Sequence, residues 1–179
     1  MPDPAPFWWA VPLVGLAGAA VATASVLANR HLIRMRATLD LIERTGSNEH
    51  YLKLRANFRR LDANSGDPAF FSRITHPTED VDKALRREIV AYINHYELVA
   101  IGCDKGILDE GFYRSWMRSH LVRDWTLAQP LVQAARTNPA DPVPGAYVGF
   151  EGMASRFRAA GIAPWFRRGA APAGRTRPR

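Results

Sequence analysis

The sequence predicts an all-α protein with one N-terminal transmembrane helix followed by a cytoplasmic bundle of four to five helices. An uninterrupted apolar run comes first, several later segments repeat apolar residues at steps of three and four, and no segment alternates as a half-buried strand does. Such a pattern is typical of helices packed around one core. We expect a short N-terminal segment, a transmembrane helix, a helical cytoplasmic domain and a disordered basic tail, at residues 1–6, 7–28, 29–160 and 161–179.

The apolar run, Phe7–Ala28, contains no Asp, Glu, Lys, Arg, His, Asn or Gln. A helix rises about 1.5 Å per residue, so about 20 residues cross the hydrocarbon core of a bilayer. A cleaved signal peptide is the alternative, but it needs basic residues before the apolar core, and the segment MPDPAP has none. Small residues near the end of the run keep this alternative open. The composition favours a retained helix.

The charges that flank the run predict its orientation. Arg30, Arg34 and Arg36 follow the run, whereas Asp3 is the only charged side chain before it. Basic residues close to a span stay on the cytoplasmic side. We therefore expect a single-pass protein of the bacterial inner membrane, with its N-terminus outside and the bulk of the chain in the cytoplasm.

Pairs of small residues occur inside the run at a spacing of four. They are Gly15 with Ala19 and Gly18 with Ala22. Small residues at this spacing let two spanning helices approach closely, which predicts a possible homodimer through the transmembrane helix. The alternative is that the pairs only reflect a sequence rich in alanine.

The net charge of +7 lies entirely at the C-terminal end. The last acidic residue is Glu151, and seven arginines follow it: Arg156, Arg158, Arg167, Arg168, Arg175, Arg177 and Arg179. The final stretch, RRGAAPAGRTRPR, has almost no large apolar side chain, which is typical of a disordered segment. We expect this tail, together with the arginines after the span, to contact anionic lipid of the inner membrane. A solubilising tail without a partner and a tail that contacts nucleic acid are the alternatives, and nucleic acid is the less favoured of the two.

The spanning helix is expected to continue through Leu32, Met35, Leu39 and Ile42 and to end near Gly46. A second helix follows, capped by Ser47 or Asn48, with its apolar face formed by Tyr51, Leu54, Phe58 and Leu61. Residues 62–77 contain many turn-forming residues and are predicted to form a loop, from which Phe70, Phe71 and Ile74 pack back.

The third predicted helix runs from about Glu79 to Asp104, with Thr78 as its N-cap and Gly106 as its stop. Its apolar stripe repeats at steps of three and four and consists of Val81, Leu85, Ile89, Tyr92, Tyr96, Val99 and Cys103. The central part also carries Asn, His and Glu, which indicates a buried core helix rather than a second span.

The fourth predicted helix begins at Asp109, which caps it, and Pro130 is expected to kink or break it. Its aromatic face contains Phe112, Tyr113, Trp116, Met117, Leu121 and Trp125. The loop TNPADPVPG comes next. A last helix presents Tyr147, Phe150, Met153 and Phe157 on one face.

Three segments resemble a known family. They are RMRATLDLIER directly after the span, IVAYINHYELVAIGCDKGILDEGFYRSWMRSHLVRDW, and GFEGM in the last helix. Together they are similar to a bacterial and prophage family catalogued as domain of unknown function 4760, over about residues 34–158. The resemblance implies a small, often membrane-anchored helical protein with no established activity. It supplies no catalytic residue.

A few polar residues of the predicted core are candidates for chemistry. Glu88, Tyr92 and His95 share one flank of the third helix, and His120 and Asp124 lie one turn apart on the fourth. A carboxylate and an imidazole beside buried phenols can form an acid–base or ligand site, but buried polar groups more often only satisfy one another by hydrogen bonds. Two ligands on one helix are a weak metal signal, so we expect no metal and no cofactor. No catalytic residue is assigned.

The functional prediction follows from the oriented anchor and the lack of a catalytic motif. We expect a non-enzymatic interaction or regulatory module with an unknown protein partner. The first alternative is a membrane-tethered enzyme or metal-dependent sensor built on Glu88, His95, His120 and Asp124. The second is contact of the tail with nucleic acid.

Overall fold

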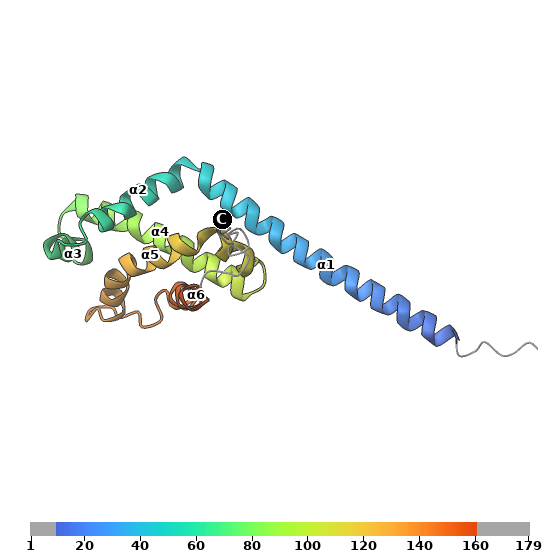
Figure 1. Cartoon of the computed structure of the whole chain (residues 1–179). Coiled ribbons are helices and arrows are strands. Elements are labelled where there is room, and N and C mark those ends of the chain that lie inside the picture. The colour runs from blue at the N-terminus through green and yellow to red at the C-terminus, as the bar shows by residue number, and fades with distance from the viewer. Residues whose placement is uncertain (1–9, 161–179) are drawn as a thin grey trace, which may run out of the picture.

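The computed structural model describes residues 10–160, in which the chain forms six helices and no strand (Figure 1). The helices are α1 (Ala10–Ser47), α2 (Glu49–Ala63), α3 (Pro68–Thr75), α4 (Asp80–Asp104), α5 (Glu110–Arg136) and α6 (Val148–Ala159). The predicted all-α class, with one long apolar helix followed by a bundle, is confirmed. The predicted basic tail and the first residues of the predicted span lie outside the described residues.

Helix α1 is a single helix of 38 residues that serves two purposes (Figure 1). Its first half extends away from the bundle with exposed apolar side chains, and it is long and apolar enough to cross a membrane. Its second half packs on the bundle through Thr38, Leu41 and Ile42. The helix therefore continues past the apolar run as predicted, and it ends at Ser47, beside the expected Gly46.

Helix α4 lies at the centre of the bundle and packs against α2, α3, α5 and α6. The predicted stripe is buried from Leu85 to Val99. Val81, which was expected to belong to it, is 72% exposed, because the neighbouring helices do not cover that side of the first turn. The prediction for Val81 is wrong, and Cys103 at the other end is half-buried.

Two of the three predicted N-caps are found in the structure. The side chain of Asn48 accepts a hydrogen bond from Tyr51 N at 2.9 Å, and that of Asp109 accepts one from Phe112 N at 2.8 Å. The residue before α4 is Glu79 rather than the expected Thr78, and its side chain makes no capping bond. Gly106 ends the helical run in the left-handed region, with φ at 67°.

Residues 62–77 were expected to form a loop, but they contain α3. Asp67 accepts hydrogen bonds from Ala69 N and Phe70 N at 2.9 and 3.1 Å, and Pro68 occupies the first turn, where its missing N–H costs nothing. The expected inward packing holds, because Phe70 and Ile74 are buried. Turn-forming residues here start a short helix instead of preventing one.

Helix α5 continues through Pro130 to Arg136, so the predicted break does not occur there. Ala128 and Val132 on either side of the proline are buried and hold the helix against the core. Trp116, which was predicted on the same aromatic face as Tyr113, Leu121 and Trp125, is 69% exposed. The buried face of α5 follows the other three residues, and Trp116 lies far around the helix from its centre.

The N-terminus of α6 is capped by a residue from another helix. Tyr147 precedes α6 in the left-handed region, with φ at 60°, and makes no side-chain cap bond. Glu97 of α4 accepts hydrogen bonds from Gly149 N at 3.1 Å and Phe150 N at 2.7 Å instead. A carboxylate favours the positive end of a helix dipole, so this contact fixes α6 on α4.

Candidate functional site

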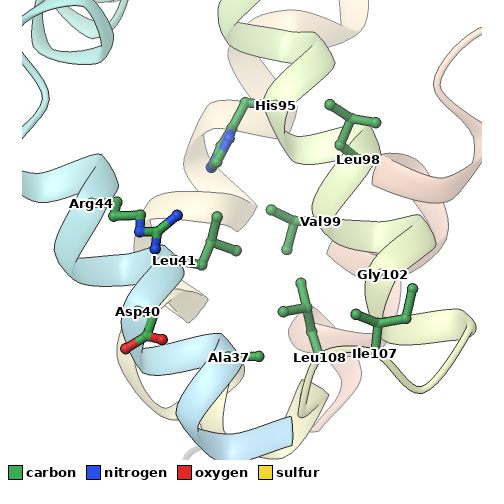
Figure 2. A pocket seen from close by; sticks show the side chains of 10 residues that line it. All are labelled: Ala37, Asp40, Leu41, Arg44, His95, Leu98, Val99, Gly102, Ile107 and Leu108. Carbon is green, nitrogen blue, oxygen red and sulfur yellow. The ribbon is translucent and has the colours of Figure 1, made fainter.

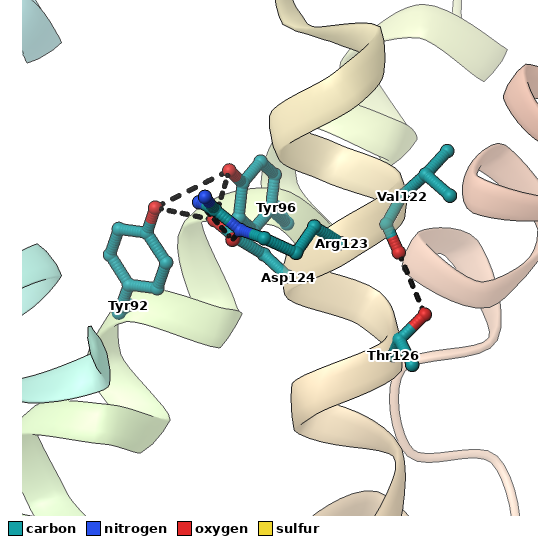
Figure 3. A network of polar contacts seen from close by, with 6 residues as sticks. All are labelled: Tyr92, Tyr96, Val122, Arg123, Asp124 and Thr126. Atoms are coloured by element: carbon teal, nitrogen blue, oxygen red, sulfur yellow. Dashed lines mark hydrogen bonds and ion pairs between the residues drawn. The ribbon is translucent and has the colours of Figure 1, made fainter. Parts of the chain in front are cut away.

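A polar cluster is enclosed between α4 and α5 (Figure 3). Asp124 is 1% exposed, and its Oδ2 accepts hydrogen bonds from the hydroxyls of Tyr92 and Tyr96 at 2.9 and 3.0 Å. Its Oδ1 accepts from Nε and Nη2 of Arg123 at 3.1 and 2.8 Å. Both oxygens of the buried carboxylate are thus satisfied. We call these four residues the tyrosine–aspartate cluster.

The phenols of the cluster act as hydrogen-bond donors. Burial raises the pKa of Tyr92 and of Tyr96 well above the usual value of 10.0, and the negative charge of Asp124 adds to the effect. Burial also raises the pKa of the adjacent Tyr51 to about 12. All three phenols stay protonated at neutral pH, so none of them is a base or a nucleophile there.

Aromatic packing connects the cluster to the rest of the bundle. The ring of Tyr96 stacks on Phe150 of α6 with centroids 4.7 Å apart, and the ring of Tyr92 lies 4.7 Å from that of Phe58 of α2. The cluster therefore links α2, α4, α5 and α6 within the core. This is the geometry of a structural network.

Glu88, a predicted site residue, makes its polar contacts elsewhere. Its carboxylate pairs with Lys53 Nζ at 2.9 Å and accepts a hydrogen bond from the amide of Asn57. Both partners lie on α2. Glu88 thus joins α4 to α2 at the rim of the bundle, away from the carboxylate of Asp124.

The two histidines also stay apart from the cluster carboxylate, with no hydrogen bond to it among the described residues. The His95 ring packs edge-on against Tyr51, with centroids 4.8 Å apart, and burial lowers its pKa to about 4. Nδ1 of His120 is buried without a hydrogen-bond partner in the described part of the chain. Burial and then the charges of Arg55 and Arg123 lower the pKa of His120.

The structure therefore brings together Tyr92 and Asp124 from the predicted set and leaves Glu88, His95 and His120 outside their hydrogen-bond network. Within residues 10–160, no three His, Cys, Asp or Glu side chains are grouped so that they could hold a metal ion. The first alternative hypothesis needed four of these residues to converge. Arg123, which completes the cluster, was not singled out from the sequence, because adjacent residues on a helix do not face each other.

A second feature is an open groove of ≈ 530 Å³ between α1 and α4 (Figure 2). Leu41 of α1 and Val99 of α4 project into it from opposite sides, and Leu98, at its edge, is 68% exposed. Charged and polar groups occur on its rim only in Asp40, Arg44 and His95. The remaining lining residues are Ala37, Gly102, Ile107 and Leu108. The groove is apolar and continuous with the surface of α1. It could not be predicted from the sequence, because its two walls come from segments that are distant in the chain.

The junction of α1 with the bundle is a third feature. The hydroxyl of Thr38, which is fully buried, accepts a hydrogen bond from Asp109 N at 2.8 Å. Nδ1 of His31 lies 3.4 Å from Oδ2 of Asp109. Asp109, which caps α5, thus also attaches that helix to α1 at two positions, His31 and Thr38, which lie two turns apart.

Comparison with known proteins adds a family and no activity. The family model described as "Domain of unknown function (DUF4760)" matches residues 12–157, which include most of the described chain. No curated protein matches the sequence. No solved structure matches it either.

Proposed function

The chain belongs to the domain of unknown function family DUF4760, and from this premise we propose that it is a single-pass membrane-anchored module that binds a protein partner and has no catalytic role. In this proposal α1 crosses the bacterial inner membrane with the N-terminus outside, and the bundle lies in the cytoplasm. The proposal rests above all on α1.

The observation that carries the proposal is the exposed apolar half of α1. The large apolar side chains of this half are all exposed, among them Leu13, Val14, Leu16, Val21 and Leu27. Water-soluble monomers rarely expose a continuous apolar surface of this kind, whereas a bilayer accommodates it. Arg30, Arg34 and Arg36 follow on one side only, which supports the cytoplasmic location of the bundle.

The polar cluster supports a structural role over a catalytic one. Asp124 is enclosed, both of its oxygens are occupied, and the phenols that bind it stay protonated at neutral pH. A substrate would have to displace core side chains to reach it. The carboxylate and the phenols, which are the groups that could transfer protons, instead form the hydrogen bonds that hold α4 and α5 together.

The groove between α1 and α4 supports the binding role. Its two helical walls and apolar floor suit an amphipathic helix of a partner protein, whose apolar face would cover Leu41, Leu98 and Val99. The charged rim of Asp40 and Arg44 would face the polar side of that helix.

Anchoring and orientation are tested in cells on the full chain. We expect the protein to resist alkaline extraction of membranes, and a reporter fused after Arg179 to be active in the cytoplasm. Val21→Arg places a charge in the middle of the span and should release the protein, whereas Val81→Arg, at an equally exposed valine of the bundle, should not. Extraction of the unaltered protein, or a reporter active outside, contradicts the proposal.

Partner binding is tested with a photo-crosslinking residue at Leu98 and, as the matched control, at Val81. Both are exposed apolar residues of α4, but only Leu98 lines the groove. We expect a discrete adduct with another protein from Leu98 alone. The same adducts from both positions, or none from either, contradict a partner site in the groove.

The tail, residues 161–179, belongs to the proposal as a contact with anionic lipid. The chain that lacks residues 167–179 should bind anionic vesicles more weakly than the full chain. The difference in affinity should be larger at low salt. Retention on nucleic acid that falls with salt and disappears on the same deletion would favour the nucleic-acid alternative instead.

A further inference from the structure

We propose that the turn between α4 and α5, residues 105–108, is a second membrane contact, through which the bundle binds the headgroup region of an anionic leaflet. We call this segment the α4–α5 turn. The inference rests on the proposed anchoring by α1 and adds to it a surface of the bundle that was not predicted from the sequence. Three observations carry it: depth, packing and charge.

The depth of the turn is fixed by its attachment to α1. Asp109, directly after the turn, contacts His31 at 3.4 Å and donates its N–H to Thr38 at 2.8 Å. With a rise of about 1.5 Å per residue, these two residues lie about 5 and about 15 Å beyond Ala28, where the apolar run ends. The headgroup layer of a leaflet is itself about 5–8 Å thick. The turn is therefore held at the level where the headgroups meet the cytoplasm.

The packing leaves the turn little freedom to move away from this level. A Cβ added to Gly106 would lie 3.9 Å from Nη1 of Arg34, so the guanidinium of α1 lies over the turn. Ile107 N and Leu108 N both donate to Gly102 O, at 2.9 and 3.1 Å, which binds the turn to the end of α4. This end of the bundle lies beside α1, whereas α3 lies at the opposite end (Figure 1).

The exposed chemistry of the turn suits an anionic interface. Ile107 is 62% exposed and Lys105 is exposed beside it. An apolar side chain next to a cation is the combination that binds at the headgroup boundary. The α4–α5 turn thus presents an apolar side chain and a cation to the headgroup layer.

The acidic residues around the turn contact basic neighbours. Arg156 of α6 pairs with Asp104 at 3.1 Å and with Glu110 at 2.9 Å, and Asp109 contacts His31. By contrast, Lys105 and Arg30 form no ion pair within residues 10–160. Lys105 and Arg30 are therefore cations at this end of the bundle that remain available to the phosphates of an anionic leaflet.

The test uses the full chain in vesicles of phosphatidylcholine and phosphatidylglycerol. Cys103 is the only cysteine, so Cys103→Ser gives a background in which single nitroxide labels can be placed. The labelled positions are Ile107→Cys in the turn, Val81→Cys at the far end of α4 and Val21→Cys in the span. Relaxation by oxygen, which concentrates in the bilayer, and by a water-soluble nickel chelate reports the depth of each label.

We expect the label at position 107 to have an oxygen-to-nickel ratio several-fold above that at position 81 and below that at position 21. Lys105→Glu should lower the ratio at 107 at least twofold and leave position 81 unchanged. A ratio at 107 equal to that at 81, with position 21 in the bilayer, overturns this inference alone, as does a ratio at 107 that does not respond to Lys105→Glu. A water-exposed label at position 21 overturns the anchoring proposal and this inference with it.

Discussion

Tyr96→Phe is the sharpest test of the structural role assigned to the tyrosine–aspartate cluster. The change removes one hydroxyl that donates to Asp124 Oδ2 at 3.0 Å and leaves the ring stacked on Phe150. A hydrogen bond to a charged group contributes about 1.5–3 kcal/mol to stability. Tyr92→Phe removes the other donor to the same oxygen, at 2.9 Å, and should cost a similar amount.

The double variant carries the stronger prediction. Each single variant leaves Oδ2 of Asp124 with one phenol donor, whereas the double variant leaves this oxygen buried with no phenol donor. An unsatisfied charged group in the core is costly, so the loss should exceed the sum of the two single losses by about 0.5–3 kcal/mol. The excess of the double-variant loss over the two single losses is the coupling free energy between the two phenols.

The assay is urea-induced unfolding of the full chain in detergent micelles, followed by far-ultraviolet circular dichroism. Thr126→Val is the matched control, because it removes an exposed hydroxyl of α5 that bonds only weakly outside its own helix, and we expect a change within about 0.5 kcal/mol. Single losses as small as that of the control, or strictly additive ones, would refute the reasoning that the cluster stabilises the core.

Three further outcomes are expected. Burial lowers the pKa of His95 to about 4 in the fold, against 6.5 in the unfolded chain, so folding favours the neutral imidazole. The contribution of His95 to the free energy of unfolding should be complete above pH 6.5 and fall by up to about 3 kcal/mol as the pH drops to 4. Urea titrations at both pH values should show that His95→Phe abolishes this loss. Glu97→Ala should cost about 1–2 kcal/mol and speed amide exchange at Gly149 and Phe150, whereas Glu79→Ala, at a cap without a side-chain bond, should change stability little. Gly18→Ile should reduce crosslinked dimers in membranes, and Leu16→Ile should leave them unchanged; equal yields would exclude the predicted homodimer face.

The sequence was sufficient for the elements whose signals are local. Caps such as Asn48 and Asp109 act within one turn, and the buried stripe of α4 from Leu85 to Val99 repeats for about four turns, so both were visible without tertiary information. Helix α3 was missed although Asp67 and Pro68 form an N-cap and a first turn. The surrounding turn residues masked this signal, and only the burial of Phe70 and Ile74 makes the short helix stable.

The candidate site was less predictable because it depends on pairings between distant segments. Periodicity placed Tyr92 and His95 on one flank of α4, but it did not determine which face of α5 would meet them. Asp124 reaches the phenols while His120, one turn earlier, does not hydrogen-bond to them among the described residues. Glu97 looked like one more polar residue in a buried helix, and its role as the cap of α6 exists only in three dimensions.

Because α1 is one unbroken helix, it fixes the direction in which the bundle projects around the axis of the span. Successive residues of a helix are rotated by about 100°, so Gly18 and Ala22 lie about 160–200° around the axis from Thr38, which faces the bundle. Two spans paired through their small residues would therefore hold their bundles back to back, pointing outward from a central pair of helices. In such a dimer each α4–α5 turn would touch the leaflet on its own flank, and any rotation of the spans against each other would turn the two bundles by the same angle.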